Sequence, residues 1–197
     1  VKPTLELLAG IPSVVYGLFA FIYIGPLVME LGEYFYQNGW IDQPPNVLNP
    51  INGAIVVGVM ILPLVASMSE DALRAVPNEL REGSLALGAT KIETTFKVMI
   101  QASLSGIIAS IILALSRAVG ETMAVTLAVG TVAVYTANMF VPAQTMTAYI
   151  AQRVGGDLPF GEIGYLTIFA VGLYLFIITL TLNLIGNKIL STYREAY

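Results

Sequence analysis

Neither cysteine nor histidine occurs among the 197 residues of this chain. Disulfides, thiolate chemistry, the usual zinc sites and the Ser-His and Cys-His catalytic pairs are therefore excluded. Charged residues are also scarce at 11% of the sequence, roughly half their share in a soluble domain. We therefore expect no catalytic group, no bound metal and no cofactor.

Hydrophobic residues are what the chain has in abundance, at 56% of the sequence with a mean hydropathy of +0.79. A helix needs about 20 apolar residues to cross a bilayer, at a rise of about 1.5 Å per residue. Four apolar segments approach or exceed that length, at residues 11–29, 51–68, 104–134 and 163–185. The sequence therefore predicts an all-α polytopic membrane protein with four transmembrane helices.

Prolines and glycines mark expected irregularities in these helices. Pro63 lies inside the second segment and should kink it. The third segment is longer than one span needs, so we expect it to be tilted, or broken near Gly120 or Gly130. Four glycines are expected at close helix-packing points: Gly10, Gly17, Gly53 and Gly58.

Basic residues gather on one side of the predicted spans. Seven of the nine basic residues belong to that side: Lys2, Arg74, Arg81, Lys91, Lys97, Lys188 and Arg194. Arg153 is alone on the opposite side, and Arg117 falls within the third apolar segment. Because cytoplasmic loops of membrane proteins carry the excess of lysine and arginine, both termini and segment 69–97 are expected in the cytoplasm.

The cytoplasmic segment 69–97 has the features of two short helices. Pro77 suits the first turn of a helix, and Gly88 suits a turn between that helix and the next. Ile92 and Phe96 are four residues apart and therefore share one helix face, which could fill a groove in another protein. The alternative is a polar loop that only joins two spans.

The spacing within this segment resembles the EAA loop of ABC importer permeases. Glu82, Gly83 and Ser84 stand at the three leading positions, and Gly88 matches the glycine of that loop. Val98 and Ile100 match the distal aliphatic pair, but Gln101 stands where the family usually has proline, so the angle at which the chain enters span three stays open. Three longer stretches resemble the permeases of phosphate-specific ABC importers: residues 5–21, 80–98 and 116–125.

This resemblance extends over nearly the whole chain and implies one permease domain over residues 1–197 with the MetI-like fold of type I ABC importers. It implies a multi-pass subunit of a prokaryotic plasma membrane, and a fragment that lacks N-terminal spans. The implied partners are a homologous permease subunit, a cytoplasmic ATP-binding subunit, an extracytoplasmic phosphate-binding protein, inorganic phosphate and membrane lipid. The chain has no GxxxxGK[ST] phosphate loop, so we expect it not to hydrolyse ATP itself. The residues implied to couple it to the ATPase are Glu82, Gly83, Ser84, Gly88, Ile92 and Phe96.

Arg117 and Glu121 are two charged residues inside the third apolar segment, four residues apart. On a single helix they would face the same side, about 6 Å apart along the axis. One interpretation is an internal salt bridge that neutralises both charges. The other is that Arg117 lines the solute path and offers a planar fork to phosphate oxygens. Glu121 would then pair with Arg117 in the absence of substrate or accept a hydrogen bond from hydrogen phosphate.

Three functions are compatible with these features. The first is a subunit that forms half of the membrane path of an ATP-driven phosphate importer. The second is a permease for another oxyanion, such as sulfate or molybdate, because an arginine alone does not separate tetrahedral anions. The third is a membrane sensor or scaffold whose cytoplasmic segment binds a regulator. An intramembrane enzyme is disfavoured, since histidine and cysteine are missing and the spans carry no paired catalytic carboxylates.

Overall fold

The computed structural model describes residues 7–8, 10–156 and 161–192, so Lys2 and Arg194 lie outside the described residues. Within this part of the chain the regular structure is helical throughout. Three helices are long and apolar enough to cross a membrane: Ser13–Gln37, Pro50–Arg74 and Ile163–Ser191. A bent pair, Lys91–Ala102 and Leu104–Val119, makes a fourth if it is counted as one span. The expected all-α polytopic fold is confirmed.

The first long helix contains a wide π-helical turn in its interior. Helix α2 (Ser13–Phe19) leads into the π-helix η1 (Ala20–Ile24) and then into α3 (Gly25–Gln37). Ala20 in the π-helical turn is fully buried and packs with Val56 and Ala128 in the core of the molecule. The π-helical turn therefore lies where the first long helix meets two other elements.

Helix α4 (Pro50–Arg74) begins at a buried polar cap. The Asn49 side chain accepts a hydrogen bond from the Asn52 backbone N–H at 2.8 Å, which satisfies one free donor of the first turn. The Asn52 amide nitrogen donates in turn to the carbonyl of Ala128 at 3.2 Å. Both asparagines are fully buried, so this polar cluster fixes the start of α4 against a distant segment of the chain.

Segment 69–97 contains the two short helices expected from the sequence. Helix α5 (Asn78–Ala86) follows Pro77, and Gly88 makes the turn with a φ of 88° that favours glycine. Helix α6 (Lys91–Thr94) starts at a capping box, in which Thr90 and Glu93 bond each other's backbone N–H groups. The chain continues through the π-helix η2 (Thr95–Met99) and α7 (Ile100–Ala102).

The third apolar segment is bent at its start and broken near its end. The helical stretch Lys91–Ala102 and helix α8 (Leu104–Val119) make an angle of 63° at Ser103. Helix α8 ends before Gly120, and helix α9 (Met123–Val129) ends at Gly130, whose φ is 101°. The expected break near Gly120 or Gly130 is confirmed at both glycines.

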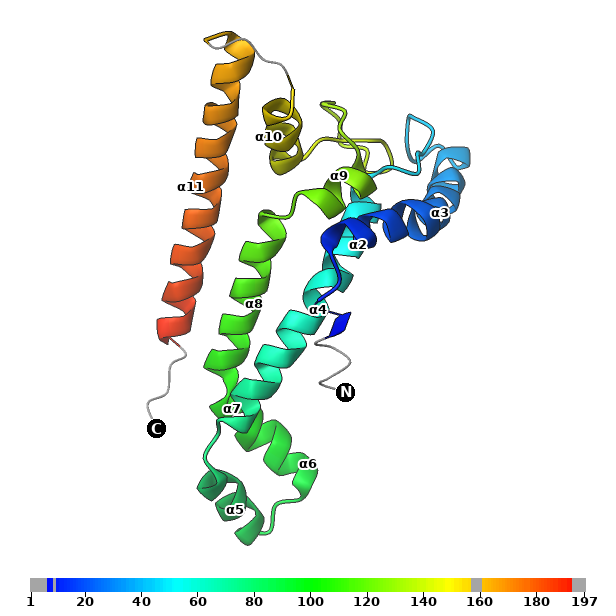
Figure 1. Ribbon diagram of the computed structural model, residues 1–197. Coiled ribbons are helices and arrows are strands. Elements are labelled where there is room, and N and C mark those ends of the chain that lie inside the picture. Colours follow the sequence, from blue (N-terminus) through cyan, green and yellow to red (C-terminus); the bar gives the residue numbers. More distant parts are fainter. Residues whose placement is uncertain (1–6, 9, 157–160, 193–197) are drawn as a thin grey trace.

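The remaining helices are α10 (Met146–Val154) and α11 (Ile163–Thr192). Helix α8 packs between α4 and α11, while α9 packs against α2 and α4, and α10 packs against α11 (Figure 1). Helices α5 and α6 lie at one end of the α4–α8 pair, and α9 and α10 lie at the other (Figure 1). Helix α11 is apolar on all sides and its most apolar stretch has no buried residue, as expected for a helix surrounded by lipid or partner helices.

Glycines allow the closest helix contacts, with one exception among those predicted. A Cβ on Gly17 would lie 2.9 Å from the Cβ of Leu127, and one on Gly53 would overlap the Val129 side chain. A Cβ on Gly58, by contrast, would meet nothing within 4 Å. The prediction holds for Gly17 and Gly53, whereas Gly58 makes no close contact within the described part of the chain.

Candidate functional site

The predicted coupling residues lie on α5, on α6 and in the turn between them. Glu82, Gly83 and Gly88 are exposed. Ile92 and Phe96 are 72% and 65% exposed, unusually high fractions for large apolar side chains. The segment therefore presents apolar side chains away from the helices that precede and follow it.

Ser84 has a different environment from the other predicted coupling residues. It is half-buried, and its hydroxyl lies 3.0 Å from the hydroxyl of Thr94, which is buried. This hydrogen bond joins α5 to α6 and sets how the two short helices pack. Ser84 thus lies in the contact between the two helices, not on the outer surface with Ile92 and Phe96.

Leu87 is a surface residue that sequence reasoning missed. It is 91% exposed and lies directly before the turn at Gly88. Leu85 is also exposed, on α5. The available signal was a pair of leucines within a segment otherwise rich in charged and small residues. Together with Ile92 and Phe96 these two leucines form what we call the apolar coupling set.

The structure separates Arg117 and Glu121 into different elements. Arg117 belongs to the last turn of α8, whereas Glu121 lies in the break between α8 and α9. The expectation that both residues share one helix is wrong, because Gly120 ends α8 between them. Among the ion pairs of the described residues, none joins Arg117 to Glu121, so the internal salt bridge is not formed.

Glu121 is engaged with the backbone around it. Its side-chain oxygen Oε1 accepts a hydrogen bond from the Ala124 backbone N–H at 3.1 Å, in the first turn of α9. Its backbone carbonyl accepts a second hydrogen bond, from the Thr147 hydroxyl of α10, at 2.7 Å. A carboxylate at a helix start satisfies a free N–H donor and complements the helix dipole. Glu121 therefore caps α9 and is half-buried there.

Arg117 remains exposed at the end of α8. It is seven residues after Ser110, and this spacing puts both on one face of the helix. Ser110 is fully buried and its hydroxyl lies 3.0 Å from that of Ser69 in α4. Arg117 therefore lies on the same side of α8 as Ser110, which faces α4. No described residue forms an ion pair with it.

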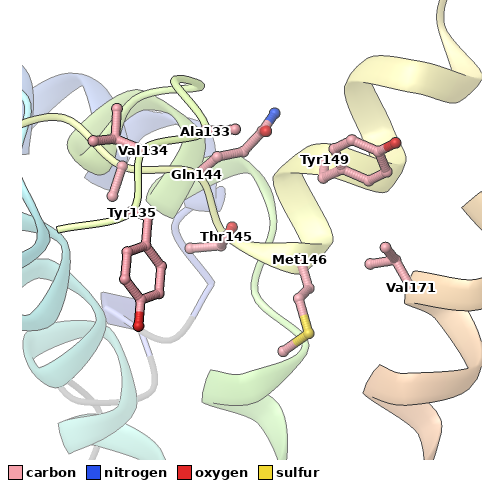
Figure 2. A pocket seen from close by; sticks show the side chains of 9 residues that line it. Ala133, Val134, Tyr135, Gln144, Thr145, Met146, Tyr149 and Val171 are labelled. Carbon is pink, nitrogen blue, oxygen red and sulfur yellow. The ribbon is translucent and has the colours of Figure 1, made fainter. Parts of the chain in front are cut away.

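Two cavities adjoin the first turn of α10. One of about 420 Å³ borders the break and is lined in part by Gly120, Thr122 and Thr147. The other, of about 450 Å³, lies between the chain entering α10 and helix α11. Figure 2 shows Thr145 at the start of α10, with Gln144 just before it, and Tyr149 reaching from α10 toward α11. The Tyr149 hydroxyl lies 2.7 Å from that of Thr167 in α11.

These features define the class of protein to which the chain belongs. The described chain is an all-α polytopic membrane protein, with a polar pair of short helices at one end and a broken, charged helix at the other. The chain belongs to the family of binding-protein-dependent transport system inner membrane components, because the sequence model of that family matches residues 1–191.

Named relatives are similar over most of the chain. A probable phosphate transport system permease protein PstC of Methanocaldococcus jannaschii is 34% identical over 96% of this chain and 62% of its own length. The phosphate transport system permease protein PstC of Mesorhizobium japonicum is 34% identical over 94% of this chain and 59% of its own length. A probable ABC transporter permease protein, YqgH of Bacillus subtilis, is 35% identical over 90% of this chain and 54% of its own length. The chain thus spans less than two thirds of the length of these relatives.

Proposed function

We propose that this chain is part of the transmembrane permease subunit of an ATP-driven importer of inorganic phosphate. It would form half of the path across the membrane and transmit the action of a separate ATPase to that path. The permeases named for phosphate transport in two relatives support the substrate. The exposed Arg117, with no ion-pair partner among the described residues, is the structural observation that carries the proposal.

The energetic argument begins with the cost of Arg117 in a bilayer. An arginine at mid-bilayer costs about 2.5–3.5 kcal/mol on insertion scales, so its charge must be compensated. Glu121 lies near it in the sequence, but its carboxylate caps α9. Arg117 is thus available to a solute anion, and its planar fork matches two phosphate oxygens. Glu121 borders the same break and would accept a hydrogen bond from the protonated oxygen of hydrogen phosphate.

Coupling to the ATPase rests on the short helices α5 and α6. The apolar coupling set of Leu85, Leu87, Ile92 and Phe96 offers a surface that a cytoplasmic ATP-binding subunit would cover. The Ser84–Thr94 hydrogen bond keeps α5 and α6 together, so that a push on one moves both. The complete assembly would contain a PstA-like second permease, a PstB-like ATPase and a PstS-like phosphate-binding protein on the outer side.

Replacement of the arginine tests this function. Arg117→Ala in the full-length permease, expressed with its partner subunits, should lower uptake of labelled phosphate by at least about a hundredfold, because an anion loses its charged partner. Co-purification of the subunits should be unchanged. Arg153→Ala, on α10, is the matched control and should leave uptake close to normal. Normal uptake by Arg117→Ala would refute the proposal.

Competition with unlabelled anions tests the substrate. Phosphate should suppress uptake of labelled phosphate, and equal concentrations of sulfate or molybdate should not. Suppression by sulfate or molybdate would favour a permease for another oxyanion. Binding of the ATPase subunit without any ATP-dependent flux would instead favour a sensor or scaffold.

A further inference from the structure

A side chain of α10 forms a hydrogen bond to the break between α8 and α9. Thr147, in the first turn of α10, is only 9% exposed, and its hydroxyl donates to the backbone carbonyl of Glu121 at 2.7 Å. The two residues are 26 positions apart in the sequence, so this bond joins separate elements. The bond ends on the residue that the proposed function places beside the solute.

The direction of the hydrogen bonds around Thr147 follows from simple counting. A hydroxyl has a single hydrogen, and a carbonyl oxygen can only accept. Thr147 therefore uses its hydrogen for Glu121, and the Thr145 hydroxyl, 3.1 Å away, must donate to Thr147. The Thr145 oxygen accepts in turn from the Ala148 backbone N–H at 3.2 Å. An ordered chain of hydrogen bonds thus runs from the start of α10 to Glu121.

On the α10 side of the break, side-chain packing does not fix the position of Glu121. Gly120, directly before it, would meet only backbone atoms of the preceding turn if it carried a Cβ. A cavity of about 420 Å³ borders Gly120, Thr122 and Thr147, so side-chain packing leaves space beside the break. The Ala124 N–H bonds the Glu121 carboxylate, and the hydrogen bond from Thr147 fixes the backbone carbonyl of the same residue from the α10 side.

We propose that Thr147 is a positioning residue of the transport path, which sets the orientation of Glu121 through its backbone carbonyl. The assignment rests on the proposed function, because it gives Thr147 a role only if Glu121 takes part in transport. Loss of the Thr147 hydroxyl leaves the backbone carbonyl of the half-buried Glu121 without its partner, so the backbone there shifts to find another donor. The carboxylate then moves away from the position that serves the solute.

The test measures phosphate uptake as a function of phosphate concentration, in cells that contain the full-length permease and its partner subunits. Thr147→Val keeps the shape and removes the hydroxyl, and should lower uptake about tenfold, the effect of a lost buried hydrogen bond. Thr147→Ser keeps the hydroxyl and should restore uptake to within about twofold of normal. Thr179→Val is the matched control, since the Thr179 hydroxyl bonds only its own helix, and should leave uptake unchanged.

A double-variant comparison separates positioning from a general structural role. In a Glu121→Gln background, whose own uptake is reduced, Thr147→Val should lower uptake further by less than about twofold, because the carboxylate that it positions is already gone. A second full tenfold loss would overturn the assignment and indicate a structural role. Normal uptake by Thr147→Val in the unaltered background would also overturn it.

The same set of variants keeps the two proposals apart. Normal uptake by Arg117→Ala would refute the proposed function. Reduced uptake by Arg117→Ala and Glu121→Gln together with normal uptake by Thr147→Val would overturn only the role of Thr147. If Thr147→Val prevents assembly, Thr147→Cys replaces it, because a thiol of similar size is a weak donor. Its uptake should fall between those of the valine and serine variants, and uptake equal to normal would overturn the assignment.

Discussion

The carboxylate of Glu121 can stabilise the molecule in two ways, as a cap of α9 or as a counter-ion of Arg117, and the two make different demands. A cap needs an acceptor oxygen, whereas a counter-ion needs a negative charge. The 3.1 Å bond to the Ala124 N–H favours the cap. We expect Glu121→Ala to lower the free energy of unfolding by about 1 kcal/mol and Glu121→Gln by less than half of that. Thermal unfolding of the purified permease in detergent measures both, and equal losses would contradict the cap.

The capping box of α6 gives a pH-dependent prediction. The pKa of Glu93 is held below its ordinary value by the Thr90 backbone N–H, then by the Thr90 hydroxyl and by the charge of Lys97. A lowered folded-state pKa means that the stabilisation is present above the unfolded-state pKa and is lost as the pH falls through the folded-state pKa. Hydrogen exchange at the Glu93 amide, corrected for its intrinsic pH dependence, should therefore accelerate only in the acid range.

The matched control for that measurement is Glu93→Gln, which cannot titrate. In this variant the protection of the residue-93 amide against hydrogen exchange should not change with pH across the acid range. That protection should be lower than the protection of the Glu93 amide in the unaltered protein at neutral pH. Acid acceleration of the same size in Glu93→Gln would show that another group controls the stability of α6.

Surface exposure that depends on local spacing could be predicted from the sequence. Hydrogen bonds between residues of different helices could not. Ile92 and Phe96 were expected on the surface from their spacing in a polar segment, and both are exposed. The resemblance to the EAA loop places Ser84 among the coupling residues, but the Ser84 hydroxyl bonds Thr94 of the next helix. Thr147 gave no signal, because its bond to Glu121 spans 26 residues and arises only when α10 folds against the break.

At the scale of elements, the contact between α4 and α9 depends on the absence of a side chain at Gly53. A Cβ there would overlap the side chain of Val129, which is itself buried. We expect Gly53→Ala to lower the free energy of unfolding by about 1–3 kcal/mol, the usual effect of overpacking. Gly58→Ala, five residues further along α4, is the matched control, because its methyl group meets nothing within 4 Å.

Helix propensity alone should make Gly58→Ala neutral or slightly stabilising, by up to about 1 kcal/mol. Thermal unfolding of the purified permease in detergent compares the two variants directly. Equal effects of the two substitutions would mean that the α4–α9 contact is looser than its geometry indicates.

The ends of the helices could be predicted from the sequence more fully than the angles between them. Glycines at positions 120 and 130 predicted the break and the end of the third apolar segment. The same sequence left open the angle at which the chain enters α8, since Gln101 stands in place of the expected proline. The structure bends by 63° at Ser103, where the buried Ser103 hydroxyl bonds the carbonyl of Ile100 at 3.3 Å. That bend depends on the packing of α8 against α4, which no local pattern encodes.

At the scale of the whole molecule, α8 joins the two candidate sites, and α4 runs beside it between the same two ends (Figure 1). Helix α8 begins at the bend that carries α6 and α7 and ends at the break beside Glu121. Its 16 residues span about 24 Å, at about 1.5 Å per residue. An uninterrupted helix of that length transmits a displacement at its start to its end, so the proposed coupling needs no other route through the chain.

The orientation of α8 in the membrane can be tested by cysteine labelling. The chain has no cysteine, so each introduced thiol is unique in it. Leu87 is 91% exposed beside the turn between α5 and α6, and Tyr135 is fully exposed in the chain that connects α9 to α10. Helices α9 and α10 lie at the opposite end of the α4–α8 pair from α5 and α6 (Figure 1). Since the basic residues around Leu87 favour the cytoplasm, a membrane-impermeant maleimide added to intact cells should label Tyr135→Cys and not Leu87→Cys. In inside-out vesicles the pattern should reverse. Labelling of Leu87→Cys from outside would invert the topology and place the apolar coupling set beyond the reach of a cytoplasmic ATPase.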